Sequence, residues 1–374
     1  MPTFFVVAAL FQLVLWATVL RCAYAPTSIG PLAPDPEARV SVIVCFRNEA
    51  DSLDECISRI LAQVFPGKFE LILVDDNSTD NSASVAHPYI ISNENVRLLD
   101  PGPTAPGKKE ALAFGIDAAR YDHLLLTDAD CIPASSHWLW GMTEPLRLGQ
   151  ELVLGASPLM PEKNEGFLAH WQWFESTYVS LKYLGFANRT RPYMGVGRNL
   201  AYTKDFYRRA GGFANHKDLP GGDDDLLVSE NAQGQRTATV TDSIAWTYSK
   251  GQPTWRTYFR QRSRHQSTGI RYPVSTGLWL GLIALSHGLF YLLGAWHLLC
   301  GDTFIALFFF VVRFALVLEA YLPPLEHFSA ANAGARGGFW SRVRLAGIVL
   351  WGDALVGPMY LYLAVSGMFS RKEW

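Results

Sequence analysis

The uneven distribution of apolar residues constrains the fold of this 374-residue chain more than any other feature. Residues 4–20 form an apolar run that only Gln12 and Thr18 interrupt. Near the other end, Asp, Glu, Lys and Arg are all missing between Tyr272 and Gly301. A helix of about 20 apolar residues is long enough to cross a bilayer. The chain therefore combines predicted membrane-spanning helices with a polar region, residues 39–271, that lies between these runs.

The apolar runs predict one N-terminal and three C-terminal membrane spans. We expect them within residues 1–25 and at 277–299, 303–322 and 345–367, and leave open whether the last one crosses fully. A cleavable signal peptide is the alternative for the first, because residues 23–25 have the small-x-small form. An anchor is favoured, since residues 1–3 carry no positive charge and Pro26 would follow the cut.

Basic residues near the ends of these spans predict the orientation. They are Arg21, then Arg256, Arg260, Arg262, Arg264 and Arg271, and finally Arg336, Arg342 and Arg344. With four spans all of them fall on one side, which the positive-inside rule makes cytosolic. We therefore expect a cytosolic domain over residues 26–276 on a plasma membrane, such as a bacterial inner membrane. Arg313, Glu319 and Asp353 lie inside apolar segments, where charges are costly, so we expect them to be paired or functional.

Composition excludes several classes of protein. The net charge is only −2, which gives no support to binding of nucleic acid. The five cysteines are scattered without C-x-x-C spacing, so neither a disulfide framework nor a structural zinc site is expected.

Strand and helix patterns alternate in the polar region. Short apolar runs typical of buried strands occupy residues 40–46, 71–74 and 123–127, and helical spacing covers 48–63 and 108–119. This order predicts an α/β domain with a mostly parallel, Rossmann-like sheet. Ligands in such folds bind beyond the carboxyl ends of the strands, and acidic clusters follow two of these runs.

Asp128 and Asp130 follow the run at 123–127. Carboxylates at this spacing can hold Mg²⁺ or Mn²⁺ together with phosphate oxygens of a substrate. A solvated turn is the simpler reading, and D-x-D alone is a weak signal. Asp75 and Asp76 end another strand, where an acid can accept from a base N–H or a ribose hydroxyl. Asx turns and a helix cap explain the same residues structurally.

Residues 221–225 place three acids after two glycines. Repulsion among Asp223, Asp224 and Asp225 is costly and can raise a pKa, and a general base or a second metal site would justify that cost. An exposed acidic loop is the alternative. The basic segment 260–265 suits a leaving diphosphate or anionic lipid equally well.

Taken in order, these motifs resemble glycosyltransferase family 2, in its membrane-anchored members such as ceramide glucosyltransferase-like enzymes and bacterial polysaccharide synthases. The similar segments are Ser41–Val44 with Asn48–Glu49, Val74–Asp80, Gly107–Ile116, Thr127–Asp130, Asp223–Leu226 and Gln261–His265. Ala113, Gly222 and His265 depart from the usual Asn, Glu and Trp. The resemblance implies a GT-A-like domain over 39–254, an interfacial helix over 255–272, and three span helices after it.

The resemblance also implies roles for individual residues. Nucleotide-sugar binding falls on Asn48, Glu49, Asp75, Asp76, Lys108, Asp128, Gln261, Arg264 and His265. Asp128 and Asp130 would hold Mg²⁺ or Mn²⁺, Asp223 would be the catalytic base, and Asp224 is the runner-up if the alignment shifts by one residue. The implied reaction is inverting transfer of a hexose or aminosugar from a nucleotide diphosphate sugar, such as a UDP-sugar, to a lipid or lipid-linked acceptor.

Two alternatives remain open. One is a processive synthase of the poly-N-acetylglucosamine type, which His265 and the small number of spans disfavour. The other is an inactive nucleotide-sugar-binding scaffold, although the acids that such a protein should have lost are all present.

Overall fold

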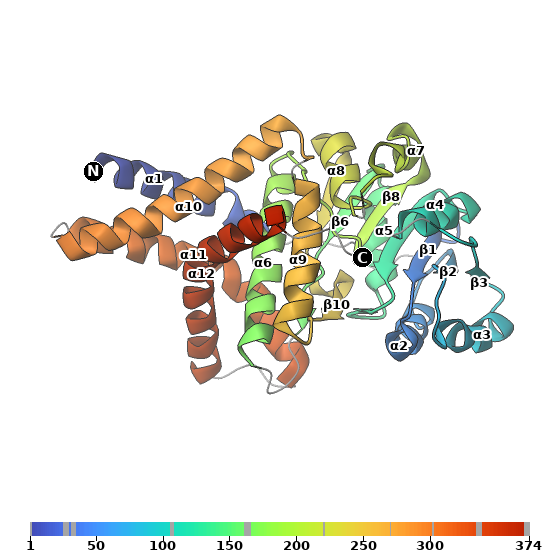
Figure 1. Ribbon diagram of the computed structural model, residues 1–374. Helices are drawn as coiled ribbons and strands as arrows, with labels where there is room; N and C mark the ends of the chain where they lie inside the picture. Colours follow the sequence, from blue (N-terminus) through green and yellow to red (C-terminus); the bar gives the residue numbers. More distant parts are fainter. Residues whose placement is uncertain are drawn as a thin grey trace. The chain divides into compact units, whose positions relative to one another are not determined.

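The computed structural model describes residues 2–24, 30, 35–104, 108–160, 166–219, 221–269, 271–300, 303–333 and 339–369. Pro26, Gly107, Gly301 and Arg336, named above, lie outside these residues. The chain divides into two compact units (Figure 1). The sheet unit comprises residues 26–158 and 190–250, and the apolar-helix unit comprises Met1–Ala25, Leu159–Arg189 and Gly251–Glu373.

The sheet unit begins with alternating strands and helices. They are β1 (Arg39–Phe46), α2 (Ala50–Leu61), β2 (Lys68–Asp75), α3 (Ser82–Ser92), β3 (Val96–Leu99), α4 (Lys109–Ala118), β4 (His123–Asp128), β5 (Cys131–Pro133) and α5 (Trp138–Arg147). The remaining elements are β6 (Leu152–Gly155), β8 (Leu200–Thr203), α7 (Lys204–Arg209), α8 (Asp225–Asn231), β9 (Thr237–Val240) and β10 (Thr247–Lys250).

These strands form a seven-stranded sheet in the order β3-β2-β1-β4-β8-β6-β9. All neighbours run parallel except that β8 pairs antiparallel with both β4 and β6. The mostly parallel α/β fold expected from the sequence is thus confirmed. The strands expected at 40–46, 71–74 and 123–127 are β1, β2 and β4, which are neighbours in the sheet.

Helices cover both faces of this sheet because successive residues of a strand point to opposite faces. Val40, Val42 and Val44 of β1 are fully buried in the core cluster that contains α2 and α5. Between them, Ile43 points to the other face, where its side chain approaches Gly115 of α4. A side chain at Gly115 would collide with Ile43 and Val74, so the glycine lets α4 lie close to the sheet.

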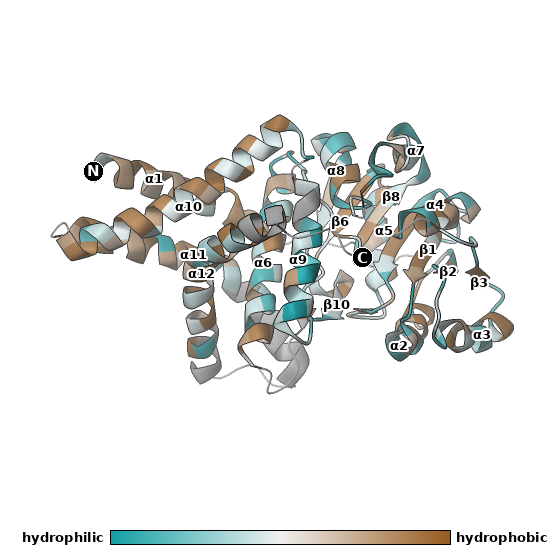
Figure 2. Cartoon of the chain, in the orientation of Figure 1, coloured by the Kyte–Doolittle hydropathy of each residue, from teal (hydrophilic) through white to brown (hydrophobic). Residues whose placement is uncertain are grey.

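The apolar-helix unit contains four helices that are long and apolar enough to cross a membrane, among the residues described. It is built from α1 (Pro2–Thr18), β7 (Leu159–Met160), α6 (Phe167–Asn188), α9 (Trp255–Gly269), α10 (Val274–Cys300), α11 (Thr303–Ala333) and α12 (Phe339–Phe369). The candidate spans are Thr3–Cys22, Val274–Cys300, Thr303–Tyr321 and Ala346–Leu363. Figure 2 shows hydrophobic residues along α1, α10 and α11, whereas α9 is largely hydrophilic.

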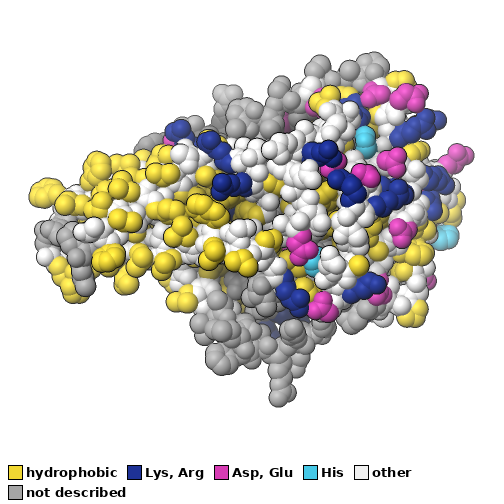
Figure 3. Space-filling model, turned by 90° about the horizontal axis from the view of Figure 1, so that it is seen from above, with side chains coloured by type: hydrophobic (Ala, Val, Ile, Leu, Met, Phe, Trp, Pro, Cys, Tyr) yellow, Lys and Arg dark blue, Asp and Glu magenta, His cyan; other side chains and the backbone are white. Residues whose placement is uncertain are grey.

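The outer face of α10 is apolar. Leu278, Leu285, Leu292 and Leu299 recur every seven residues and keep 69%, 60%, 70% and 85% of their surface exposed. Figure 3 shows hydrophobic side chains covering most of the visible face of this end of the unit. Soluble proteins rarely expose apolar patches of this extent, so this surface is suited to a lipid environment.

A buried polar network connects all four candidate spans. Arg313 of α11 pairs with Asp353 of α12, and its Nε donates to Oε1 of Gln12 in α1 at 3.2 Å. His287 of α10 contacts Arg313 at 3.1 Å through Nδ1, and Tyr291 donates to Asp353. Arg313 and Asp353 are 2% and 0% exposed. The charges inside the apolar segments are therefore paired, as expected.

Replacing Arg313 with Met should destabilise the protein strongly, because Asp353 would remain as a buried charge without its partner. Breaking one side of a buried ion pair typically costs about 3–5 kcal/mol. A double variant, Arg313→Met with Asp353→Leu, should recover most of the melting temperature in detergent, since neither charge remains. An equal loss in the single and double variants would show that the pair itself is not what stabilises the spans.

Candidate active site

The site begins where three neighbouring strands end at the same edge of the sheet. In the parallel register, Phe46 of β1 lies opposite Asp75 of β2, and Cys45 lies opposite Asp128 of β4. The side chains that follow these strands therefore share the edge at which α/β sheets bind ligands.

Asp128 and Asp130 can hold a divalent cation at this edge. One oxygen of each, together with the Cys131 sulfur, lies within 4.8 Å of the others. Burial, and then the charge of Asp128, raise the pKa of Asp130. Burial also raises the pKa of the Cys131 thiol well above its usual range, so it stays protonated. The two carboxylates are thus the fitting ligands, and hard oxygen donors suit Mg²⁺ or Mn²⁺.

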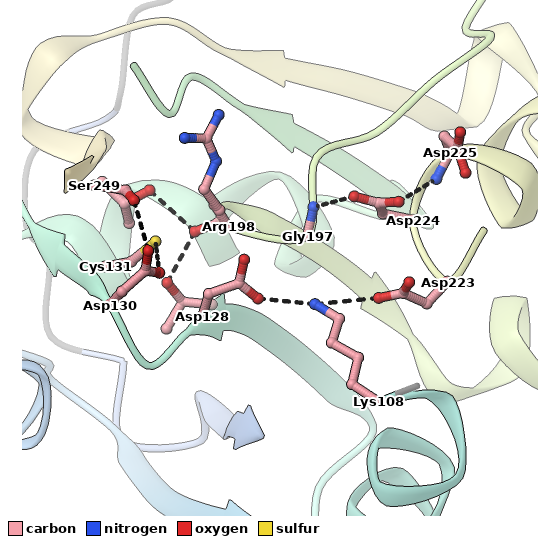
Figure 4. A network of polar contacts seen from close by, with 12 residues as sticks. Lys108, Asp128, Asp130, Cys131, Gly197, Arg198, Asp223, Asp224, Asp225 and Ser249 are labelled. Atoms are coloured by element: carbon pink, nitrogen blue, oxygen red, sulfur yellow. Dashed lines mark hydrogen bonds and ion pairs between the residues drawn. The ribbon is translucent and has the colours of Figure 1, made fainter. Parts of the chain in front are cut away.

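Ser249 of β10 orients Asp130 from a distant part of the sequence. Its hydroxyl donates to Oδ2 of Asp130 at 2.9 Å, and β10 pairs antiparallel with β5 just after the D-x-D turn. The backbone carbonyl of Arg198 accepts from the hydroxyls of Thr127 and Thr247, at 2.8 Å and 3.0 Å. These contacts fix the turn from both sides (Figure 4).

Lys108 joins the D-x-D turn to the acidic loop. Its Nζ lies 2.8 Å from Oδ1 of Asp128 and 3.1 Å from Oδ2 of Asp223, and Figure 4 shows it between the two. Burial alone would lower its pKa, but the carboxylates of Asp128, Asp223 and Asp224 outweigh burial and raise the pKa well above its usual range. Lys108 therefore stays protonated and carries a positive charge between two acids.

The acidic loop at 221–225 belongs to the sheet unit and is largely buried, so it is not the exposed acidic loop of the alternative. Gly222 has φ +97°, and a side chain there would collide with Leu226. Asp223 and Asp225 are each 8% exposed. Glycine permits this left-handed turn at little cost, which brings the acids towards Lys108.

Asp223 and Asp224 have different surroundings. Oδ2 of Asp224 accepts from the backbone N–H of Gly197 and Oδ1 from that of Asp225, both at 2.7 Å. The Asp224 carboxylate thereby caps the N-terminus of α8. Burial, followed by repulsion from Asp223 and Asp225, raises the pKa of Asp224 to about 7. The rise in pKa that a crowded acid cluster predicts is thus found at Asp224, both of whose carboxylate oxygens accept from backbone N–H groups. Asp223 instead contacts Lys108.

The second predicted cluster adjoins the ends of β1 and β2. Oδ1 of Asp75 accepts from Ser78 N–H at 2.8 Å, and Asp76, 4% exposed, accepts from the hydroxyl of Thr104. Asn48 has φ +57° and accepts from Thr79 N–H at 2.8 Å. These contacts hold the turns after β1 and β2 in place, but neither is an Asx turn, because Asp75 accepts from the third residue after it and Asn48 from a residue 31 positions away.

Glu49 has a similar local role. Its backbone N–H donates to Ser82 at 2.8 Å, and its carboxylate accepts from Ser52 at the same distance. The structure thus brings Asn48, Glu49, Asp75 and Asp76 to one edge, where hydrogen bonds within the chain hold them in place.

The other predicted residues lie on α9, in the apolar-helix unit. Gln261 is half-buried, whereas Arg264 and His265 are exposed. Their assignment to donor binding stays a prediction. Sequence reasoning did not identify Ser249, Thr104 or Gly197, because each reaches the site through tertiary contacts that no local motif signals.

Lys109 positions the acidic loop from behind. It is 7% exposed, and its Nζ donates to the carbonyls of His216 and, at 2.7 Å, Leu219, just before that loop. Lys109→Met should leave both buried carbonyls without a donor, at a cost of about 1–3 kcal/mol. We expect a lower melting temperature and a lower kcat with little change in donor Kd. Lys109→Arg should restore part of both, and an unchanged kcat in Lys109→Met would show that the loop is fixed by other contacts.

Profiles of two related families match the chain. The family described as "Glycosyl transferase family 2" matches residues 41–209, and "Glycosyl transferase family group 2" matches residues 138–326. The first match runs from β1 to the last residue of α7 and includes Lys108, Asp128 and Asp130. The second reaches through the acidic loop and α9 into α11.

Three proteins illustrate the likeness. Glycosyltransferase AglE of Haloferax volcanii is 27% identical over 191 residues, which are 49% of this chain and 58% of that protein. Glycosyltransferase GlyG of Streptococcus pneumoniae is 34% identical over 93 residues, 25% of this chain and 30% of GlyG. Poly-beta-1,6-N-acetyl-D-glucosamine synthase of Staphylococcus aureus is 34% identical over 91 residues, 24% of this chain and 21% of the synthase. The matches thus span less than two thirds of each relative.

One solved structure shares the fold along nearly the whole chain. The mannosyltransferase PcManGT of Pyrobaculum calidifontis superposes with a TM-score of 0.53 at 18% identity, covering 94% of this chain and 96% of PcManGT. At this identity the likeness concerns the fold alone, and it confirms the expected GT-A architecture.

Proposed function

Since the chain belongs to glycosyl transferase family 2, we propose that it is a membrane-bound, inverting glycosyltransferase that moves a hexose or aminosugar from a nucleotide diphosphate sugar to a lipid or lipid-linked acceptor. The observation that supports this best is the line of charges Asp128, Lys108 and Asp223 at the carboxyl edge of the sheet. In this line, Asp128 as a predicted metal ligand and Asp223 as a candidate base lie on opposite sides of the Lys108 ammonium.

The donor diphosphate would bind at Asp128, Asp130 and Lys108. Mg²⁺ or Mn²⁺, when bound by the two carboxylates, would supply a Lewis acid that takes up charge on the leaving diphosphate. PcManGT was solved with GDP-mannose and Mn²⁺, which agrees with this choice of ligands. Nucleotide-sugar binding is also proposed for two further groups of residues, which are Asn48, Glu49, Asp75 and Asp76 at the sheet edge and Gln261, Arg264 and His265 of α9.

Lys108 gives a reason why the base would become active only with donor bound. Without donor, its ammonium is shared between Asp128 and Asp223. A diphosphate offers a stronger partner to an ammonium group than a single carboxylate does. As Lys108 turns to the phosphates, Asp223 would lose its counter-ion and could accept the proton of the attacking hydroxyl.

The acceptor is proposed to be lipid-borne because the apolar-helix unit exposes four leucines on one face of α10, namely Leu278, Leu285, Leu292 and Leu299. A processive synthase is the second candidate, and the likeness to the S. aureus poly-beta-1,6-N-acetyl-D-glucosamine synthase favours it. His265, where such enzymes carry Trp, favours a single transfer.

Membranes containing the protein should transfer label from one member of a panel of nucleotide sugars into extractable lipid. A single labelled glycolipid supports the proposal, whereas a ladder of chain lengths would assign the chain to the processive class. Donor binding without product for any acceptor fraction would point to a scaffold. Membranes with Asp130→Asn serve as the matched control, since their lipids and other enzymes are the same.

We also propose that residues 26–276 face the cytosol of a cell such as a bacterium, where nucleotide sugars are made. Protease added to sealed cells should leave this region intact and should cleave it after lysis. Cleavage in sealed cells would reverse the orientation.

A further inference from the structure

Within the apolar-helix unit, α6 and α9 bring two cations together with one counter-ion. Arg262 Nη2 lies 2.7 Å from Oε2 of Glu175, which is 1% exposed. The same oxygen accepts from Tyr258 at 3.0 Å, and Trp171 donates to the Tyr258 hydroxyl at 2.6 Å. Arg262 and Tyr258 thus already occupy the single carboxylate of this cluster.

The second cation, Lys182, has no such partner. It lies two helical turns after Glu175 on α6, half-buried. Its ammonium sits 4.4 Å from the ring centre of Tyr178 and 5.3 Å from that of Tyr360 on α12. In the part of the chain that the structure describes, it has neither a hydrogen bond nor an ion pair. Among these residues only the two ring faces meet the charge of Lys182, so its three N–H donors can still bind an anion from outside the chain.

The surroundings add positive charge. The pKa of Lys182 is lowered to about 8, chiefly by burial. The positive charge of Arg262 also lowers it, and the negative charge of Glu175 acts in the opposite direction. The Nε of Arg262 also lacks an acceptor among the described residues. An anion that bound here would meet both Lys182 and Arg262, which share the one carboxylate of Glu175.

We propose that Lys182, whose ammonium is held by the rings of Tyr178 and Tyr360, binds the phosphate group of a membrane lipid. Tyr360 belongs to the candidate span Ala346–Leu363, and the next residue, Leu361, is 68% exposed. A phosphate held by Lys182 would therefore lie beside an apolar helix along which its acyl or prenyl chain can extend. The lipid is either a phosphate-bearing acceptor or an anionic phospholipid, and both present the same group to Lys182.

The proposal rests on the membrane association in the proposed function, but its test needs no sugar transfer. Protein in detergent is titrated with short-chain phosphatidylglycerol, a polyprenyl phosphate, phosphatidylcholine and inorganic phosphate, with binding read from intrinsic fluorescence and melting temperature. The wild type should bind the first two and should prefer them to phosphatidylcholine. Lys182→Met should weaken both by about 5-fold or more, the scale of one lysine at an anionic lipid surface.

Lys182→Arg should keep the binding, because the charge is retained. Arg59→Met, which removes an exposed cation of the sheet unit, should not change it and controls for general charge effects. Unchanged lipid affinity in a folded Lys182→Met, or an equal loss in Arg59→Met, would overturn the proposal. Binding of inorganic phosphate as strong as that of the lipids would overturn the lipid assignment.

The source of the phosphate is separated by kinetics. If the lipid is the acceptor, Lys182→Met raises the KM for polyprenyl phosphate, and the label appears on that lipid. If it is an anionic phospholipid, phosphatidylglycerol binds without becoming labelled. Loss of sugar transfer with intact lipid binding would contradict the proposed function alone.

Discussion

Asp223→Asn is expected to lower the rate of sugar transfer by at least about 10²-fold while leaving donor binding nearly unchanged, since general base catalysis contributes typically 10²–10⁴-fold. An acceptor hydroxyl attacks the anomeric carbon efficiently only if a carboxylate takes its proton as the bond forms. Asn has the same shape but cannot take that proton. The measurement is single-turnover transfer with saturating donor, together with donor Kd from titration.

Asp224→Asn is the matched control, one residue away in the same loop. Its carboxylate oxygens accept from Gly197 and Asp225, and an amide can replace only one of these acceptors. We expect a lower melting temperature and a modest loss of rate, and an effect milder still for Asp225→Asn. If Asp224→Asn abolishes transfer in a folded protein while Asp223→Asn does not, the base is Asp224. If neither variant matters, the base lies elsewhere.

The fold could be predicted from local sequence because the buried strands are almost continuous apolar runs. Val40–Phe46 and Leu71–Val74 contain too few polar residues for a surface strand, and parallel sheets covered on both faces need such runs. The positions of Asp75 and Asp128 follow from the same pattern, because each is the last residue of its strand. The sequence could not reveal that β8 joins the sheet antiparallel, since Leu200–Thr203 is too short to carry a directional signal.

The chemistry at the sheet edge could be predicted only in part. The motifs name the acids, but they do not say which partner each acid has. Ser249 reaches Asp130 from 119 positions away, and Gly197 reaches Asp224 from 27 positions away. Such contacts arise from tertiary packing and have no local spacing. The sequence therefore leaves two choices open, because each depends on the contacts of the acid. Asp130 can be a metal ligand or a turn residue, and Asp224 can be a base or a helix cap.

In the candidate membrane spans, the cost of a buried charge predicts more than any motif does. A lone charge in hydrocarbon is costly, so Arg313 and Asp353 are expected to be paired or functional. Their pairing confirms this, and Glu319 likewise pairs with Arg21 at 3.4 Å. The sequence does not indicate that Gln12 and His287 complete the first network, because polar residues on separate helices become neighbours only through packing.

Asp130→Asn should nearly abolish turnover, and a chelator such as EDTA should do the same to the wild type. In the proposed reaction, the metal and its two carboxylates carry the charge that develops on the diphosphate, and loss of a charged ligand weakens both metal binding and that stabilisation. Excess Mn²⁺ should restore the chelated wild type fully, but Asp130→Asn only weakly. Ser249→Ala is the matched control. It removes the hydroxyl that orients Asp130 but leaves both carboxylates, so it should raise the Mn²⁺ concentration needed for half activity by about 10–100-fold, as other outer-shell changes do. Full activity in chelator would show that the D-x-D turn is structural and that Lys108 alone binds the diphosphate. In that case Lys108→Met would lose turnover, and Asp130→Asn would not.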